Sequence, residues 1–285
     1  MRSGNYCGLF VMNKRQKIIG GCQMRFVVFL DIDGVLNTRT TVKRTPYGYT
    51  GIDDARVKVL ANAIEKCGLP REELFITTKI WITNAGYEKA KASINKSLKK
   101  LKTNYIDLLL IHQPFGDYYG SYRAMEEAYK AGKVRAIGVS NFYPDRYLDI
   151  VHFSEIKPAV NQVETHIFQQ QKVAKEYMTK NNTQIMSWGP FAEGRNDYFN
   201  TKELIEIGKT YGKTPAQVAL RFLIQSGVVV IPKSVHKERM EENFNVFDFT
   251  LNSEEMAQLE ALDTGNSLFF SHHDPKTVEW FMSIV

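Results

Sequence analysis

Short apolar runs alternate with segments of helical length from residue 74 onward, and this alternation constrains the fold more than any other feature. Each run is rich in Val, Ile and Leu and is bounded by polar residues or Gly, as buried parallel strands are. The runs are LFITT (74–78), IDLLLIH (106–112), VRAIGVS (134–140), AVNQVE (159–164), QIMSW (184–188) and VVVIP (228–232). Strands that alternate with helices form βα units, and six units in series favour a barrel over an open sheet.

The segments between these runs have helical character. They are YEKAKASINKSLKKLK, YGSYRAMEEAYKAG, PDRYLDIV, QQQKVAKEYMTKN and a pair around 201–226. In the last of them Thr214 can cap a helix, Pro215 suits its first turn and Gly227 follows its end.

The chain upstream of residue 68 has a different pattern. FVVFLDID (26–33) predicts a buried strand and residues 53–67 predict an amphipathic helix, joined by a long loop rich in Thr, Gly and Pro. This strand makes seven, whereas a closed barrel of this type needs eight. CGLFVM (7–12) is a poor eighth because no crossover helix follows it. We therefore predict an α/β fold, a (β/α)8 TIM-type barrel that is incomplete at its N-terminal βα units.

Composition limits the classes of partner that the chain is expected to bind. The formal charge of +6 is spread along the chain, which argues against a nucleic-acid groove and is compatible with an anionic cofactor. Cys7, Cys22 and Cys67 are scattered and predict neither a disulfide framework nor a zinc site. No apolar run has the length of a membrane span, and no secretion signal is recognised. We expect a cytoplasmic monomer that acts on a small molecule, without metal, membrane or nucleic acid.

Ordered motifs from residue 68 to the end identify a family resemblance. They are GLPREELFITTKIW (68–81), IDLLLIHQP (106–114), RAIGVSNF (135–142), NQVETH (161–166), SWGPFAEG (187–194), IPKSVHKERMEEN (231–243) and the ending LDTGNSLFFSHHDPKTVEW. The chain resembles the aldo-keto reductases in this order. The resemblance divides it into an unassigned extension (1–23), a distinct segment (24–67) and a reductase barrel (68–285).

The resemblance implies reduction of an aldehyde or ketone to an alcohol. In this family a Tyr protonates the carbonyl oxygen, an adjacent Lys lowers the pKa of that Tyr, an Asp holds the Lys, and a His orients the carbonyl. Lys79 and His112 match the Lys and the His, and both end strands, where the catalytic mouth of a barrel lies. Outside these motifs a surface Lys and a core His would be the commoner reading. Trp81 matches a substrate contact.

The same resemblance implies NADPH as cofactor. Ser140, Asn141 and Gln162 match the residues that bind the carboxamide, and Trp188 matches the aromatic that stacks on the nicotinamide, followed by Gly189, Pro190 and Phe191. The adenosine half would contact Lys233, Ser234, Val235, Arg239, Glu242 and Asn243. A Lys and an Arg at a helix start suit a 2′-phosphate, so we expect NADPH rather than NADH.

The segment 24–67 departs from the family. The pattern resembling IDTAxxYGNE, which carries the catalytic Asp and Tyr, is absent. FVVFLDIDGVLN instead resembles the first motif of the haloacid-dehalogenase superfamily, in which Asp31 would be the nucleophile and Asp33 the general acid beside Mg²⁺. Met24 stands where such a chain could begin, and its later motifs are missing here.

The position of this segment leaves the catalytic acid open. Asp31 or Asp33 would end a strand beside Lys79, and Tyr47 or Tyr49 would stand in the turn before the next helix. We expect the long loop to keep both tyrosines out of reach, so that the chain binds NADPH but turns over slowly. The alternatives are a non-catalytic NADP(H)-binding barrel and, with less support, a phosphohydrolase of the haloacid-dehalogenase type.

Overall fold

The computed structural model describes residues 61–62, 65–234 and 236–283, together with the backbone of three short strands at 28–31, 44–45 and 48–49. Several expectations concern residues outside this set. They include the extension 1–23 with CGLFVM, Asp33, Tyr47 and Val235, and the side chains of Asp31 and Tyr49. Of the helix expected at 53–67, residues 61–62 and 65–66 are described and are helical.

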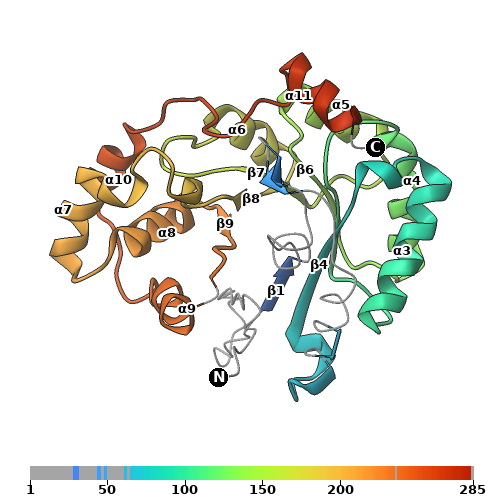
Figure 1. Ribbon diagram of the computed structural model, residues 1–285, viewed down its shortest axis with the longest axis horizontal. Helices are drawn as coiled ribbons and strands as arrows, with labels where there is room; N and C mark the ends of the chain where they lie inside the picture. Colours follow the sequence, from blue (N-terminus) through green and yellow to red (C-terminus); the bar gives the residue numbers. More distant parts are fainter. Residues whose placement is uncertain are drawn as a thin grey trace.

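One parallel sheet of seven strands forms the centre of the molecule, in the order β1-β4-β5-β6-β7-β8-β9. The strands are β1 (Val28–Asp31), β4 (Leu74–Ile80), β5 (Leu108–Ile111), β6 (Ile137–Ser140), β7 (Val160–Glu164), β8 (Gln184–Trp188) and β9 (Val229–Val230). The sheet curls into an arc with β1 and β9 at its edges (Figure 1). A separate ribbon pairs β2 (Arg44–Thr45) with β3 (Gly48–Tyr49).

The strand order confirms two sequence expectations. All six runs from residue 74 onward form strands, and FVVFLDID contributes a seventh, with Val28 paired to Leu74 and Asp31 to Thr77. The last run is shorter than expected, because β9 holds only Val229–Val230. The curled sheet agrees with part of a (β/α)8 barrel, and eight units are not found in the described residues.

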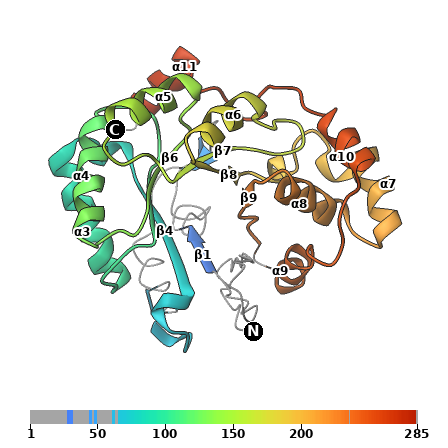
Figure 2. The same cartoon turned by 180° about the vertical axis from the view of Figure 1, so that it is seen from behind.

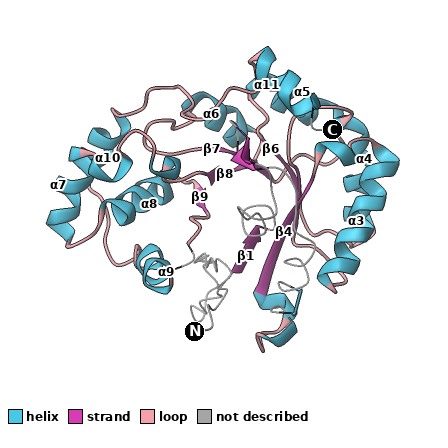
Figure 3. Cartoon of the chain, in the orientation of Figure 1, coloured by secondary structure: helices cyan, strands magenta, loops and turns pink. Residues whose placement is uncertain are grey.

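Helices cover the outer face of the arc (Figures 2 and 3). They are α3 (Tyr87–Leu101), α4 (Tyr118–Lys130), α5 (Pro144–Phe153), α6 (Lys172–Lys180), α7 (Lys202–Tyr211), α8 (Pro215–Gln225), α9 (Lys237–Phe244), α10 (Ser253–Glu260) and α11 (Pro275–Ser283). Single 3-10 turns occur at Arg71–Glu73, Ile82–Asn84, Ala192–Gly194 and Tyr198–Asn200. Helix α11 lies beside α5 in both views.

Local sequence signals explain where α8 begins and ends. The Thr214 side chain accepts a hydrogen bond from the Gln217 amide, and the Gln217 side chain accepts one from the Thr214 amide, which completes a capping box. Pro215 occupies the first turn, and Gly227 has φ +75° just beyond the end. These features agree with the expectation from the sequence.

Side chains from the sheet and the helices form a closely packed core. Leu108, Leu110 and Val139 on the strands are fully buried, and Leu220 on α8 is 1% exposed. Gly138 allows close approach of β6 to β7, because a Cβ there would stand 2.4 Å from the Val160 carbonyl oxygen. This packing fixes the carboxyl ends of the strands relative to one another.

A buried ion pair joins the beginnings of β4 and β5. Asp107, which is 3% exposed, accepts hydrogen bonds from the Arg71 guanidinium at 2.7 Å and from the Ile76 amide at 2.9 Å. Arg135 reaches the other carboxylate oxygen at 3.4 Å. Because these partners satisfy the buried carboxylate, Asp107 holds β4 and β5 in register at the end opposite the predicted site.

Candidate active site

Four of the predicted site residues form one hydrogen-bonded group at the carboxyl ends of the strands. The Asn141 side chain donates to the His112 carbonyl at 3.1 Å, and the Trp188 indole donates to Asn141 Oδ1 at 2.7 Å. The Asn141 amide donates to the Gln162 carbonyl at 2.9 Å. Lys79 is the residue before the last in β4 and pairs with Leu110, two positions before His112. The strand ends therefore bring the predicted residues together.

Asn141 has an unusual backbone conformation. Its φ of +64° lies in the left-handed region of backbone conformations. Residues other than Gly rarely adopt this region, and among them Asn tolerates it best. The residue follows β6 directly and is 5% exposed, so both its backbone conformation and its burial restrict the position of its side-chain amide. Strained residues of this kind gather at functional sites.

Gln162 offers a buried donor. The Ser140 hydroxyl donates to the Gln162 carbonyl at 2.9 Å, which holds β6 to β7. Gln162 is 1% exposed, and within the described residues its side-chain Nε2 has no hydrogen-bond partner. Because an unsatisfied buried donor is costly, this atom calls for an acceptor from a ligand.

The Trp188 ring stands between the strands and the C-terminal tail. It contacts Phe269 edge to face at a ring distance of 5.0 Å, and Arg195 covers Phe269 at 4.3 Å. Gly189 follows with φ +62°, and a Cβ there would touch Phe269 at 3.6 Å. The indole plane is thus held by its hydrogen bond on one side and by the tail on the other.

Trp81 joins His112 to a cluster of aromatic side chains. Trp81, at the end of β4, meets the His112 ring edge to face at 4.8 Å. Phe281 of α11 lies 6.2 Å from Trp81 and 5.3 Å from Phe115. The predicted substrate contact Trp81 therefore adjoins the predicted catalytic His112, and the last helix completes the same apolar wall.

A second feature is a cavity of about 510 Å³ between the loop that follows β9, the start of α8 and helix α9. Five of the residues predicted for the adenosine half line it, together with Phe191; the five are Lys233, Ser234, Arg239, Glu242 and Asn243. Lys233 and Arg239 are exposed, whereas Ser234 and Asn243 are buried. Two exposed cations near the start of α9 make the cavity suitable for an anionic group.

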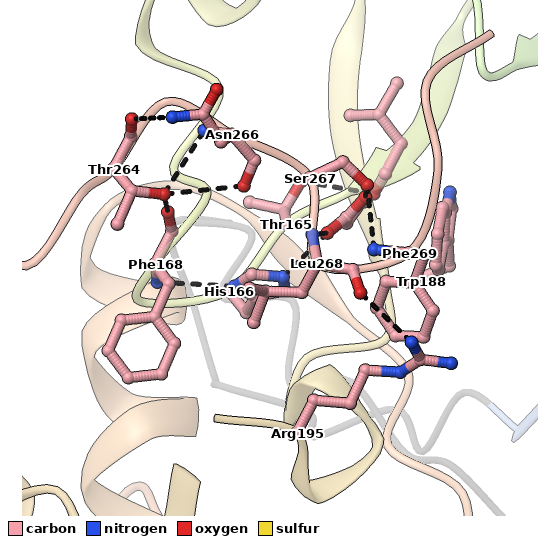
Figure 4. A network of polar contacts seen from close by, with 12 residues as sticks. Thr165, His166, Phe168, Trp188, Arg195, Thr264, Asn266, Ser267, Leu268 and Phe269 are labelled. Atoms are coloured by element: carbon pink, nitrogen blue, oxygen red, sulfur yellow. Dashed lines mark hydrogen bonds and ion pairs between the residues drawn. The ribbon is translucent and has the colours of Figure 1, made fainter. Parts of the chain in front are cut away.

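The tail from Thr264 to Phe269 is tied to the barrel by polar contacts (Figure 4). The Glu164 carboxylate accepts from the Leu268 amide and the His166 ring, both at 2.9 Å, and from the Ser267 hydroxyl. The Arg195 side chain donates to the Leu268 carbonyl at 3.1 Å. A buried carboxylate on β7 thus fixes the segment that touches Trp188.

The comparisons with known proteins agree with this geometry. The family model described as "Aldo/keto reductase family" matches residues 47–264, about three quarters of the chain. The chain belongs to the aldo-keto reductase family. The match begins at residue 47, inside the segment 24–67, and so extends further toward the N-terminus than the resemblance expected from residue 68.

Relatives of known activity are similar over most of their length. A 9,11-endoperoxide prostaglandin H2 reductase of Trypanosoma cruzi is 42% identical over 222 residues, 76% of this chain and 78% of that protein. A glyoxal reductase of Bacillus subtilis is 42% identical over 221 residues, 76% of this chain and 79% of that protein. A Bombyx mori aldo-keto reductase solved in complex with NADP has a TM-score of 0.69 and 31% identity, covering 75% of each chain. The chain is therefore an aldo-keto reductase, and the expected NADP-type cofactor agrees with the family.

The residues of this aldo-keto reductase fit that cofactor at two places. The unpartnered Gln162 Nε2, beside Asn141 and Ser140, suits a carboxamide oxygen. The cavity with Lys233 and Arg239 suits a phosphate. In the described residues no cluster of His, Cys, Asp or Glu could hold a metal ion. Within the same residues, every helix is too short or too polar to cross a membrane.

The sequence reasoning missed part of the second cavity. Its wall also includes the turn at Glu193 and Gly194, Phe199, the start of α8 (Thr214–Ala216), and His236. The sequence predicts the helix cap at Thr214 but carries no sign that the start of α8 faces α9. The resemblance of residues 25–67 to haloacid dehalogenases stays a prediction, since neither the described residues nor the comparisons bear on it.

Proposed function

We propose that this aldo-keto reductase reduces a small aldehyde or ketone with NADPH, as a monomer in the cytoplasm. The observation that carries the proposal is the strand-end group of His112, Asn141 and Trp188 beside Gln162, whose side-chain Nε2 has no partner among the described residues. Family membership and the relatives named glyoxal and methylglyoxal reductase favour carbonyl reduction, and this group gives the chain a means to orient a nicotinamide.

The chain's residues divide the binding of the cofactor between the two places described above. Asn141 and Gln162 would bind the carboxamide, and the Trp188 face would support the ring. Lys233 and Arg239 would pair with the 2′-phosphate, which NADH lacks. Bound NADPH supplies the hydride; the protein orients both reactants, which removes much of the entropic cost of the reaction.

The carbonyl oxygen would be met by the groups at the ends of β4 and β5. His112 would donate a hydrogen bond to it, and Lys79 would lower the pKa of a neighbouring tyrosine by stabilising the phenolate. The tyrosine hydroxyl gives its proton to that oxygen as the alcohol forms. Because the family match includes residue 47, we propose Tyr47 as this donor, in place of the slow turnover expected from the sequence.

The proposed substrate class rests on the relative named glyoxal reductase, which is 42% identical to this chain. Beside His112, Trp81 contacts Phe281, which in turn contacts Phe115, so one wall of the site is apolar. We therefore propose short α-dicarbonyls, with glyoxal and methylglyoxal as the first compounds to test.

The test is an NADPH oxidation assay with methylglyoxal, run beside a fluorescence titration of NADPH binding. Lys79→Met should lower kcat by roughly 10²-fold or more, as loss of acid–base assistance does, while NADPH still binds. Lys96→Met, on the exposed face of α3, is the control and should match the unmodified protein. NADPH binding without any carbonyl turnover would favour the non-catalytic alternative.

A second pair of variants locates the proton donor. Tyr47→Phe should abolish turnover but leave NADPH binding intact, whereas Tyr49→Phe should retain most of the activity. Equal activity of the unmodified protein and Tyr47→Phe would refute the assignment to Tyr47. Loss confined to Tyr49→Phe would transfer the role to that residue.

A further inference from the structure

His272, in the tail before α11, is buried against the strand-end group. It is 2% exposed and lies among the rings of Phe115, Phe270 and Phe281, with ring distances of 5.8, 5.1 and 6.0 Å. Its Nε2 lies 2.7 Å from Gln113 Oε1. Gln113 follows His112 directly, so His272 reaches the predicted active site through one intermediate side chain.

The direction of each hydrogen bond in this group follows from Trp188. An indole N–H can only donate, so the atom of Asn141 that faces it at 2.7 Å is the carbonyl oxygen. The Asn141 NH₂ therefore points the other way, toward the His112 carbonyl at 3.1 Å and Gln113 Oε1 at 3.3 Å. The same NH₂ lies 3.2 Å from the Ser140 hydroxyl oxygen. Because a Gln113 NH₂ at 3.3 Å would set two donors against each other, the Gln113 atom that faces Asn141 is its oxygen.

This orientation fixes the tautomer of His272. Because Gln113 offers an oxygen, the ring nitrogen beside it, Nε2, carries the hydrogen. Nδ1 is then the acceptor, 3.4 Å from the Tyr143 hydroxyl, which itself accepts from the His272 amide at 3.3 Å. Burial, with Arg146 and His273 nearby, lowers the pKa of His272 to about 3, so the ring is neutral near pH 7.

We propose that His272 is a positioning residue that orients the Asn141 side chain for the nicotinamide through Gln113. The inference rests on the function proposed above. The Nε2–H of His272 holds the Gln113 oxygen toward Asn141, and that oxygen holds the Asn141 NH₂ away from Trp188. Without the ring N–H, the Gln113 amide can turn its own NH₂ toward that of Asn141. Two donors would then face each other, and the Asn141 amide, still oriented by Trp188, would lose one of the contacts that hold it in place.

Binding of NADPH measures this role directly. His272→Leu keeps the apolar contacts but removes the N–H, and should raise the Kd for NADPH roughly threefold to tenfold, the range for one neutral hydrogen bond. His272→Gln returns an N–H near the position of Nε2 and should restore most of the affinity. His273→Leu, at the exposed neighbour, is the matched control and should leave the Kd unchanged.

A double-mutant cycle separates positioning from general packing. In the background of Asn141→Ala the effect of His272→Leu on the Kd should vanish, because the residue that it orients is gone. A Kd effect of the same size in both backgrounds would overturn the proposal, and so would the absence of any effect of His272→Leu. Failure of the unmodified protein to bind NADPH would instead refute the proposed function.

A measurement on the unmodified protein without cofactor tests the orientation itself. The ¹⁵N shifts of the His272 ring should show a neutral Nε2–H tautomer that does not titrate between about pH 5 and 8. An Nδ1–H tautomer or a titrating ring would refute the inferred orientation even if the variants fail to fold. The NMR result does not depend on NADPH and therefore distinguishes this inference from the proposed function.

Discussion

Replacing Arg71 by Met should destabilise the barrel strongly, although the residue lies far from the predicted site. The guanidinium donates to the carbonyls of Leu74 and Tyr105 at 2.7 and 2.8 Å, to the Thr103 hydroxyl at 2.9 Å and to Asp107 at 2.7 Å. Its side chain is 22% exposed and that of Asp107 is 3% exposed, so the pair is largely removed from water.

The size of the loss in stability depends on which hydrogen bonds the Asp107 carboxylate retains in the variant. Breaking a buried pair costs about 3–5 kcal/mol. The carboxylate retains the Ile76 amide at 2.9 Å and the exposed Arg135 at 3.4 Å, so we expect a loss near the lower limit, ~3 kcal/mol. Arg71→Lys keeps the positive charge but not the planar guanidinium. Its free energy of unfolding should therefore lie between those of the unmodified protein and Arg71→Met.

Thermal and urea unfolding followed by circular dichroism measure this loss. Arg123→Met, at an exposed position on α4, is the matched control and should change the free energy of unfolding by less than about 0.5 kcal/mol. A loss of under ~1 kcal/mol in the free energy of unfolding for Arg71→Met would refute the reasoning. The buried pair would then contribute no more to stability than a surface ion pair does.

Three further predictions concern the site. Arg239→Ala should weaken NADPH binding by ~1.5–3 kcal/mol and leave NADH binding unchanged in fluorescence titration; equal losses for both cofactors would contradict a 2′-phosphate contact. Gln162→Leu should weaken both cofactors to the same extent, because the carboxamide is common to them; unaltered Kd values would exclude Gln162 Nε2 as a donor. His272 has a pKa lowered from 6.5 to about 3 by burial, so its neutral ring stabilises the fold fully above pH 6.5 and loses that contribution as the pH falls toward 3. His272→Gln should therefore lose less stability than the unmodified protein over this range, by up to about 1.4 kcal/mol per pH unit, and parallel curves would contradict the assignment.

The repetitive part of the fold was predictable because its signals are local. Runs such as QIMSW are short, have an apolar centre and recur between helical segments, which favours buried strands, and the Thr214–Pro215 start of α8 is specified by adjacent residues. The parallel pairing of β1 with β4 followed from the order of the units. The end of β9 was not predictable, because the Pro232 ring removes a donor without indicating how early the ladder stops.

The candidate site was predictable only in part. The resemblance named Asn141, Gln162 and Trp188 separately, and the structure links the backbone or side chain of each in one group. The role of His272 lies outside such reasoning, because its contact with Gln113 joins residues 159 positions apart. A contact of that kind depends on the path of the tail over the strand ends, which no local pattern encodes.

The Thr214 hydroxyl has a consequence for how a ligand in the second cavity can be detected. Its single hydrogen is donated to Glu242 on α9, while its oxygen accepts the Gln217 amide hydrogen at the start of α8. One oxygen atom thus belongs to the cap of one helix and to the wall formed by another. A ligand that binds Glu242 would remove the acceptor of the Thr214 hydroxyl hydrogen. The hydrogen bond that the same hydroxyl accepts from the Gln217 amide would then change as well. The rate of hydrogen–deuterium exchange at the Gln217 amide would then show whether a ligand occupies the cavity.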